Sequence, residues 1–105
     1  MKLIMNGDDF GITRGVNAAM IDCFSKGYLS STSMMVNMPA AKEASELMKA
    51  YPKLSVGIHL NLTVGKPLTD CPSLVKADGT FNKNMLKDSS MVNVKEMECE
   101  LRAQM

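Results

Sequence analysis

Hydrophobic and polar residues follow two alternating periods along the chain. Residues 2–6 (KLIMN) form a short apolar run that ends at a glycine-rich turn, which is typical of a strand covered on both faces. From Thr13 onward, apolar side chains recur at helical spacing, with Thr13 as a candidate N-cap and Gly27 as a candidate stop. The first segment is therefore predicted to be a strand followed by a helix.

The same order occurs a second time. Residues 29–38 (LSSTSMMVNM) predict another strand, and helical spacing returns between Pro39 and Pro52. Proline is tolerated in the first turn of a helix but cannot continue one, so these two prolines delimit the helix. Residues 54–63 (LSVGIHLNLT) predict a third strand.

The remaining residues predict a loop and one more helix. Residues 65–81 contain two prolines and an Asp-Gly turn, so they predict a loop. The last helix begins at Asn93, whose side chain can cap it. Glu96, at the third helical position, can accept a hydrogen bond from the Asn93 N–H in return.

Strands that alternate with helices predict βαβ units and a parallel sheet with right-handed crossovers, which places the chain in the α/β class. We expect residues 1–105 to form a single domain. Helical spacing continues to Met105 without a stop signal, and the third parallel strand would keep an exposed edge. The chain is therefore expected to be an N-terminal fragment of a longer protein. If it folds alone, we expect it to hide its exposed surface by self-association, as a homo-oligomer, or by rearrangement.

Alternate side chains of the predicted strands differ in polarity, because side chains alternate between the two faces of a strand. In the third strand, one face carries Ile58, Leu60 and Leu62, and the other carries His59, Asn61 and Thr63. In the second strand, one face carries Thr32, Met34, Val36 and Met38, and the other carries Ser31, Ser33, Met35 and Asn37. Polar side chains on one side of successive strands are typical of a (β/α) barrel near its catalytic end. The sequence therefore predicts the N-terminal part of a TIM-like barrel, with about three strands.

Asp8 and Asp9 follow the first apolar run, and His59 lies late in the third predicted strand. Carboxylates and imidazoles are ligands of divalent metals, and a cation lowers the energy of neighbouring carboxylates. Adjacent residues of an extended segment point in different directions, so one carboxylate could bind the metal while the other acts as general base. Each assignment has a structural alternative. Asp8 and Asp9 could form a turn and place charge before a helix N-terminus, and His59 could be a hydrogen-bonded core histidine.

Composition excludes several classes of protein. The chain is 46% hydrophobic and 22% charged with a net charge of +1, which is typical of a globular protein. It has no basic run that would indicate a nucleic-acid partner, and no apolar stretch reaches the ~18 residues that a membrane span needs. No secretory signal is recognised at the N-terminus, and Cys23, Cys71 and Cys99 form no CxxC pair, so we expect reduced thiols in the cytoplasm.

Three segments, in this order and spacing, resemble the N-terminal portion of the YdjC-like family of carbohydrate (chitooligosaccharide) deacetylases. They are NGDDFGITRGVNAAM, GYLSSTSMMVNMPAA and VGIHLNLTVGKPL. The resemblance covers nearly the whole chain and weakens after Gly79. It implies a barrel hydrolase with a divalent metal, Mg²⁺ in many members and Zn²⁺ as the alternative. The implied reaction removes acetyl groups from N-acetylglucosamine units of small oligosaccharides.

The same resemblance implies roles for individual residues. Asp9 and His59 match metal ligands, and Asp8 matches the catalytic base. Separately from these matches, we expect the loop 65–81, which follows the third predicted strand, to line the sugar cleft, with Asn61 and Lys66 as substrate contacts. Structural hydrogen bonding is the alternative for Asn61, and simple solvent exposure is the alternative for Lys66.

The chain departs from the family pattern in two places. Gly7 stands where the family usually has alanine, which leaves the acidic pair in place. The family also has a further metal-binding histidine, whereas His59 is the only histidine here. That ligand and the general acid are therefore expected to lie beyond Met105.

Two rival functions remain. A different metal-dependent hydrolase, acting on phosphate esters or another amide, would use the same ligands. The second rival is that residues 1–105 are a non-catalytic fragment that self-associates, since the chain contains only part of the set of metal ligands.

Overall fold

The structure is a computed structural model that describes residues 1–88 and 90–105 completely and Ser89 by its backbone alone. Two compact units divide the polypeptide, the N-terminal unit (residues 1–59) and the C-terminal unit (residues 60–105). The strands and α-helices are β1 (Asn6–Phe10), α1 (Arg14–Ser25), β2 (Ser31–Met34), α2 (Ala41–Ala50), β3 (Ser55–Ile58) and α3 (Val94–Gln104). Short 3-10 helices are η1 (Pro72–Leu74), η2 (Met85–Lys87) and η3 (Ser89–Met91). None of the described helices is long and apolar enough to cross a membrane.

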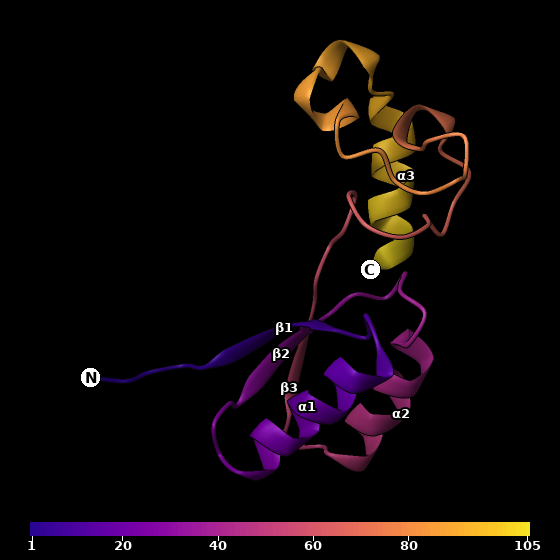
Figure 1. The fold of residues 1–105 in the computed structure, drawn as a ribbon. Helices are drawn as coiled ribbons and strands as arrows, with labels where there is room; N and C mark the ends of the chain where they lie inside the picture. Colours follow the sequence, from indigo (N-terminus) through magenta and orange to yellow (C-terminus); the bar gives the residue numbers. More distant parts are fainter. The chain divides into compact units, whose positions relative to one another are not determined.

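Three short strands form the sheet of the N-terminal unit. They lie parallel in the order β1-β2-β3, with Asn6 opposite Ser31 and Ser31 opposite Ser55. Figure 1 shows α1 and α2 on the same face of this sheet. The predicted α/β class, with three parallel strands alternating with helices, is confirmed, and the arrangement is consistent with an incomplete barrel.

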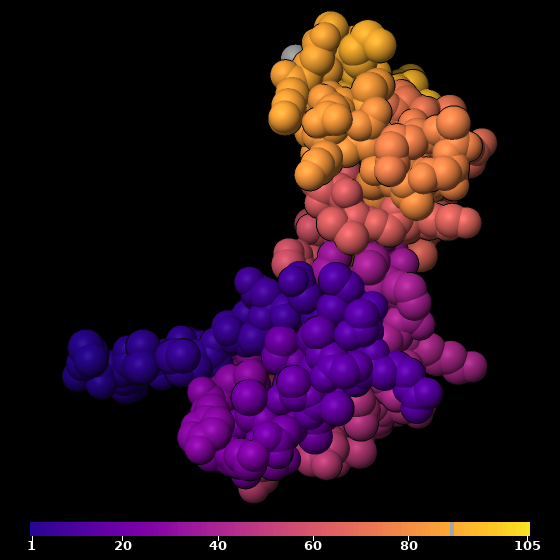
Figure 2. Space-filling view, viewed as in Figure 1, coloured from indigo at the N-terminus to yellow at the C-terminus, as the bar shows by residue number. Residues whose placement is uncertain are grey.

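β1 begins later than the sequence predicts. The predicted strand covered residues 2–6, whereas β1 comprises Asn6–Phe10 and residues 2–5 are exposed. Figure 2 shows this segment, at the indigo end of the colour scale, projecting from the rest of the N-terminal unit. Pairing with β2 begins at Asn6, and Phe10 is fully buried at the other end. Asp8 and Asp9 therefore lie within the strand rather than beyond it.

β2 and β3 are shorter than predicted, because each chain segment turns early. β2 ends at Met34, after which the Met38 N–H donates to the Met35 carbonyl at 3.3 Å. β3 ends at Ile58. The faces predicted for residues 35–38 and 60–63 are therefore wrong, since strand alternation does not extend to them.

Both predicted helices of the N-terminal unit are confirmed. The Thr13 hydroxyl accepts a hydrogen bond from the Val16 N–H at 3.2 Å, as an N-cap should. At the other end, Gly27 has φ 76° and its N–H donates to the Phe24 carbonyl at 3.0 Å. This left-handed conformation favours glycine, so the helix ends where the sequence indicates.

The C-terminal unit has its own small core. Cys71, Leu74 and Phe81 are buried, and an isolated antiparallel bridge joins Val75 to Phe81. The segment predicted as a loop, residues 65–81, therefore has few regular elements but a packed interior. Burial raises the pKa of the Cys71 thiol, which keeps it neutral.

The predicted last helix is confirmed, with one correction at its start. The Asn93 side chain accepts hydrogen bonds from the N–H groups of Lys95 and Glu96, at 3.0 and 3.4 Å. A capping box also requires the Glu96 side chain to accept a hydrogen bond from the Asn93 N–H, and this bond is not formed. Instead, the Asn93 N–H donates to the Ser73 hydroxyl at 3.0 Å, and Glu96 accepts from the Ser73 N–H at 2.9 Å. Ser73 in η1 thus bonds to both residues in place of the local reciprocal bond.

Glu100 is a fully buried carboxylate that organises the C-terminal unit. It accepts hydrogen bonds from the Leu68 and Thr69 N–H groups at 3.0 and 2.8 Å, from the Thr69 hydroxyl at 2.7 Å and from Gln104 Nε2 at 2.7 Å. Burial opposes its charge, but these donated bonds outweigh burial and hold the pKa of Glu100 below its ordinary value. The helix is thereby tied to residues 68 and 69 of the loop.

Replacing Glu100 tests how much this carboxylate stabilises the unit. We expect Glu100→Gln to lower the free energy of unfolding by about 2–4 kcal/mol, because an amide cannot accept all of these bonds. Urea denaturation of the chain would measure the change. Glu98→Gln on the same helix is the matched control and should change it little, since Glu98 forms an exposed pair with Arg102.

The same carboxylate predicts a direction for pH dependence. Its folded-state pKa is depressed, so its contribution to stability is fully present above the ordinary carboxyl range and is lost as pH falls through the folded-state pKa. Unfolding curves measured from neutral to acidic pH should therefore show a smaller loss of stability in Glu100→Gln than in the wild type. Equal losses in the two proteins would contradict this role.

Candidate functional site

The end of β1 has an unusual backbone that determines where its acidic side chains point. Asp9 has φ 69°, and it is the one residue other than glycine with positive φ among the described residues. The pairing register with β2 shifts between Gly7 and Phe10, which marks an irregularity around Asp9. Such a conformation costs about 1–3 kcal/mol and persists only where surrounding contacts impose it. Asp9 is thus held out of regular strand alternation.

Asn17 on α1 holds the turn that follows Asp9 from inside the unit. Its side chain is fully buried, accepts a hydrogen bond from the Gly11 N–H at 2.7 Å, and donates to the Ala40 carbonyl at 3.0 Å and to Glu43 at 2.9 Å. One amide thereby links the turn after β1 to the beginning of α2.

Gly11 itself is required by its surroundings. It has φ 96°, and an added Cβ would lie 3.0 Å from the Met35 carbonyl oxygen and 3.2 Å from Ala41 Cα. Both neighbours are backbone atoms, which cannot move aside as a flexible side chain can. The turn can therefore pass closely over the start of α2 only with glycine at this position.

Gly7, the first departure from the family pattern, also has a local reason. A Cβ added there would meet the Met20 sulfur and would lie 3.1 Å from Leu29 Cδ2. In this chain, side chains from α1 and the following loop thus fill the space that an alanine methyl would occupy.

His59 lies directly after β3 and approaches Asp9. Its backbone N–H donates to the Met34 carbonyl at 2.9 Å, which continues the pairing with β2. Its Nδ1 atom lies 3.2 Å from Asp9 Oδ1, and the two side chains are 36% and 49% exposed. The two atoms are in contact range, but they are not aligned as a hydrogen bond. Nδ1 is buried and has no hydrogen-bond partner among the described residues.

This unsatisfied nitrogen beside a carboxylate oxygen fits the predicted metal. A cation bound by both groups would satisfy the nitrogen lone pair and neutralise the carboxylate, and Zn²⁺ in particular accepts this mixed nitrogen and oxygen set. Among the side chains that the structure describes, however, no three His, Cys, Asp or Glu residues are grouped so that they could hold a metal ion. The chain presents two candidate ligands rather than a complete set.

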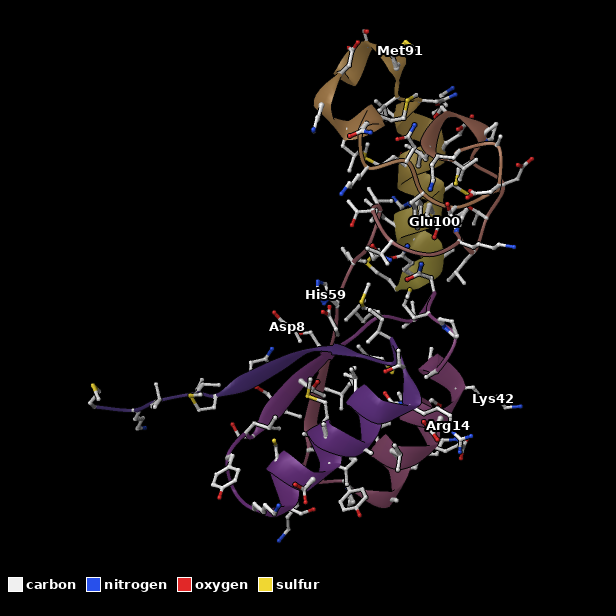
Figure 3. The ribbon with its side chains drawn as sticks, viewed as in Figure 1. Asp8, Arg14, Lys42, His59, Met91 and Glu100 are labelled. Carbon is white, nitrogen blue, oxygen red and sulfur yellow. The ribbon has the colours of Figure 1, made fainter. Side chains whose placement is uncertain are left out.

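Asp8 occupies the same sheet face as His59. Figure 3 shows both side chains on the side of the sheet opposite α1 and α2. The Asp8 carboxylate accepts a hydrogen bond from Asn6 Nδ2 at 2.9 Å, and the same amide nitrogen donates to the Ser33 hydroxyl at 3.1 Å. Of the three residues predicted to meet, Asp9 and His59 are in contact, and Asp8 faces the same side.

Asn61 and Lys66 belong to the C-terminal unit. Asn61 is 4% exposed, and its side chain closes a turn by accepting from the Thr63 and Val64 N–H groups, both at 3.0 Å. This is the structural alternative that the sequence left open for Asn61. Lys66 is exposed. Contact of either residue with a sugar stays a prediction.

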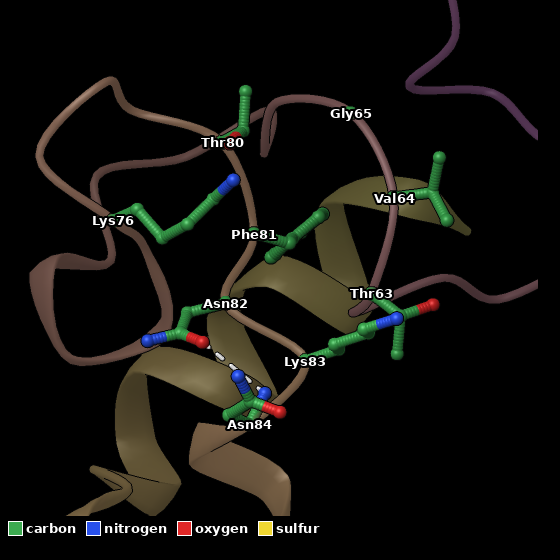
Figure 4. Close-up of a pocket in the computed structure, with 9 residues that line it drawn as sticks. All are labelled: Thr63, Val64, Gly65, Lys76, Thr80, Phe81, Asn82, Lys83 and Asn84. Carbon is green, nitrogen blue, oxygen red and sulfur yellow. Dashed lines mark hydrogen bonds between the residues drawn. The ribbon is translucent and has the colours of Figure 1, made fainter.

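The C-terminal unit also contains an open pocket of about 410 Å³ (Figure 4). Two lysines, Lys76 and Lys83, lie in its wall together with polar residues of the loop. The remaining lining residues are Thr63, Val64, Gly65, Thr80, Phe81, Asn82 and Asn84. Residues 65–81 therefore contribute to a concave surface whose size lies within the range of ligand pockets, and its contact with a sugar stays a prediction.

Comparison with known proteins identifies the family. A family model described as YdjC-like protein matches residues 2–105. The chain belongs to the YdjC-like family. The resemblance predicted from the three sequence segments is thus confirmed.

Several relatives of this YdjC-like chain carry functional names. It is 45% identical to a carbohydrate deacetylase of Halalkalibacterium halodurans, over 99% of this chain and 46% of that protein. It is 53% identical to carbohydrate deacetylase 2 of Listeria innocua, over 79% of this chain and 34% of that protein. The crystal structure of a proposed cellobiose-phosphate cleavage protein from Enterococcus faecalis V583 matches with a TM-score of 0.85 and 34% identity, over 96% of this chain and 41% of that one. The chain thus spans less than half the length of these relatives.

Sequence reasoning assigned no role to Asn6 or Asn17, and it placed Ser33 on the polar face of the second strand without assigning it a contact. A weak signal existed for Asn17, because it lies three residues before Met20 and so borders the apolar stripe of its helix. No periodicity distinguishes a polar residue that will be buried there from one that faces solvent. Asn6 and Ser33 were not distinguishable, since their contact joins residues 27 positions apart.

Removing the Asn17 amide tests whether it holds the turn. We expect Asn17→Ala to lower the free energy of unfolding by about 2–4 kcal/mol, since buried backbone groups lose their partner. The hydrogen bond from Asn17 lowers the pKa of Glu43, with a further contribution from Arg14, so that pKa should rise in the variant. Urea denaturation and an NMR titration would measure both effects. Arg14→Ala is the control and should leave stability nearly unchanged, because Arg14 is exposed; an equal loss in both variants would contradict the role of Asn17.

Proposed function

We propose that this chain carries part of the active site of a metal-dependent carbohydrate deacetylase. Its substrates would be chitooligosaccharides, from which it would hydrolyse acetyl groups of N-acetylglucosamine units in the cytoplasm. Membership of the YdjC-like family and the names of the relatives support the reaction class. The single structural observation that supports the metal is the buried His59 Nδ1, 3.2 Å from Asp9 and without a hydrogen-bond partner among the described residues.

Each residue would have a distinct role in the reaction. Asp9 and His59 would hold the divalent metal, Mg²⁺ by family resemblance or Zn²⁺. When bound, such a metal supplies Lewis acidity that polarises an acetamide carbonyl or a water molecule. Asp8 would accept the proton of the attacking water as general base. The amine would leave with a proton from an acid outside residues 1–105, so that one amide and one water give acetate and a free amine.

Separate substitutions distinguish the metal ligands from the base. In the complete gene product that contains residues 1–105, Asp8→Asn should lower kcat for acetate release from diacetylchitobiose by about 100- to 10,000-fold. It should retain bound metal, because Asp8 is not proposed as a ligand. Asp9→Asn and His59→Ala should lose both metal and activity. Acetate assays and elemental analysis of the purified proteins would measure these outcomes.

The control for this series is Asp22→Asn, which removes an exposed carboxylate on α1 that pairs with Lys26. It should change neither metal content nor rate. Undiminished activity in both Asp8→Asn and Asp9→Asn would contradict the proposed site. Release of phosphate without acetate from matched substrates would instead support the rival metal-dependent hydrolase.

Residues 1–105 by themselves are expected to be inactive and to self-associate. β1 and β3 each have an edge without a partner strand among the described residues, and Leu3, Ile4 and Met5 are exposed beside one of them. Exposed edges next to apolar residues favour pairing with another copy. Size-exclusion chromatography should therefore show a species larger than a monomer, and Ile4→Lys should shift it toward the monomer. A monomer that holds one metal ion tightly per chain would contradict this expectation.

A further inference from the structure

Asn6 makes a hydrogen-bonding bridge on the open face of the sheet. Its Nδ2 atom donates to Asp8 Oδ1 at 2.9 Å and to Ser33 Oγ at 3.1 Å. Asn6 and Asp8 are two residues apart on β1, which places their side chains on the same face. Ser33 lies on the neighbouring strand β2. One amide thus connects the proposed base to the adjacent strand.

The Asp8 carboxylate fixes the orientation of the Asn6 amide. An ionised carboxylate can only accept hydrogen bonds, so the nitrogen rather than the oxygen of Asn6 must face Asp8. The second N–H of the same nitrogen is directed to the Ser33 hydroxyl. Rotating the amide by half a turn would bring its oxygen against the Asp8 carboxylate and would lose that bond, whereas the Ser33 hydroxyl can donate to an oxygen as well as accept from a nitrogen. The amide therefore has one favourable orientation.

This bond also restricts the Asp8 carboxylate. With Oδ1 engaged by Asn6, rotation of the carboxylate is limited, and the direction of its second oxygen is set. Asn6 and Asp8 are both exposed, so the bond between them adds little to folding stability. A fixed direction matters more to a general base, because proton transfer requires the accepting oxygen within hydrogen-bond reach of the attacking water.

We propose that Asn6 is a positioning residue for Asp8, with Ser33 holding the Asn6 amide in place. The proposal rests on the function proposed above, in which Asp8 is the general base. Asn6 does not touch the reacting atoms and acts through the carboxylate. Its loss should therefore affect the chemical step and leave substrate binding nearly unchanged.

Kinetics of variants in the complete gene product would test this role with acetate release from diacetylchitobiose. Asn6→Ala should lower kcat by about 10- to 100-fold while KM changes by less than about twofold, because a misplaced catalytic group costs about this much. Ser33→Ala should have a smaller effect of the same kind. Asn6→Asp should lower kcat further than Asn6→Ala, since it removes the donor and places a negative charge beside Asp8.

A double-mutant cycle separates positioning from a general structural effect. In an Asp8→Asn background, Asn6→Ala should cause no further loss of kcat, because the group on which it acts is already absent. Ser55→Ala is the matched control for Ser33→Ala, since it removes an exposed hydroxyl from β3. It should leave kcat and KM unchanged, and circular dichroism should show all variants folded.

The outcomes distinguish this proposal from the function on which it rests. If Asp8→Asn is fully active, the assignment of the base fails, and the positioning role fails with it. If Asp8→Asn is impaired but Asn6→Ala has wild-type kcat, the positioning role alone is overturned. Equal losses from Asn6→Ala in the wild-type and Asp8→Asn backgrounds would also overturn it, because Asn6 would then act independently of Asp8.

Discussion

The side chain of Asn17 is the contact on which the geometry of the N-terminal unit depends. It holds the turn after β1 through Gly11, and it holds the beginning of α2 through Ala40 and Glu43. The turn and the beginning of α2 are also joined by a backbone hydrogen bond, in which the Ala40 N–H donates to the Gly11 carbonyl at 3.0 Å. A hydrogen bond is directional, whereas apolar contact is not, so the amide fixes the path of the turn.

That fixed path explains how the chain sustains an unfavourable backbone at Asp9. The left-handed conformation costs free energy, and the bonds around Gly11 offset it at the next turn of the chain. In regular alternation, Asp9 would face opposite to Asp8 and away from the open side of the sheet. The irregularity in β1 instead brings its carboxylate to the imidazole of His59. The turn that follows Asp9 is thus held by a residue that is not itself a candidate metal ligand.

Local signals in the sequence were sufficient to predict the helices. Thr13 and Gly27 delimit α1 because capping and left-handed glycine are properties of a few neighbouring residues. Strand ends were predicted poorly because they depend on the partner strand. The apolar run at residues 2–5 has the composition of a strand, yet regular pairing with β2 begins only at Asn6. Local composition cannot reveal where a distant segment begins to pair.

Dependence on distant segments also explains why the candidate site was only partly predictable. Asp8, Asp9 and His59 could be chosen for their chemistry and their place at strand ends. The orientation of these side chains could not, because it depends on long-range polar contacts such as the one between Asn6 and Ser33.

Buried polar groups have a large share in both units because the apolar cores are small. Among the side chains that the structure describes, the buried apolar ones are Phe10, Met35, Ala40, Ala44, Leu54, Cys71, Leu74 and Phe81. Packing of so few side chains does not by itself fix the connecting segments. Buried hydrogen bonds fix them instead, at Gly11 and Ala40 through Asn17 and at Leu68 and Thr69 through Glu100. Such groups are costly when any bond is missing, so they favour one arrangement over its alternatives. The paths of the segments that Asn17 and Glu100 join are thus set by these bonds more than by the amount of apolar surface that is buried.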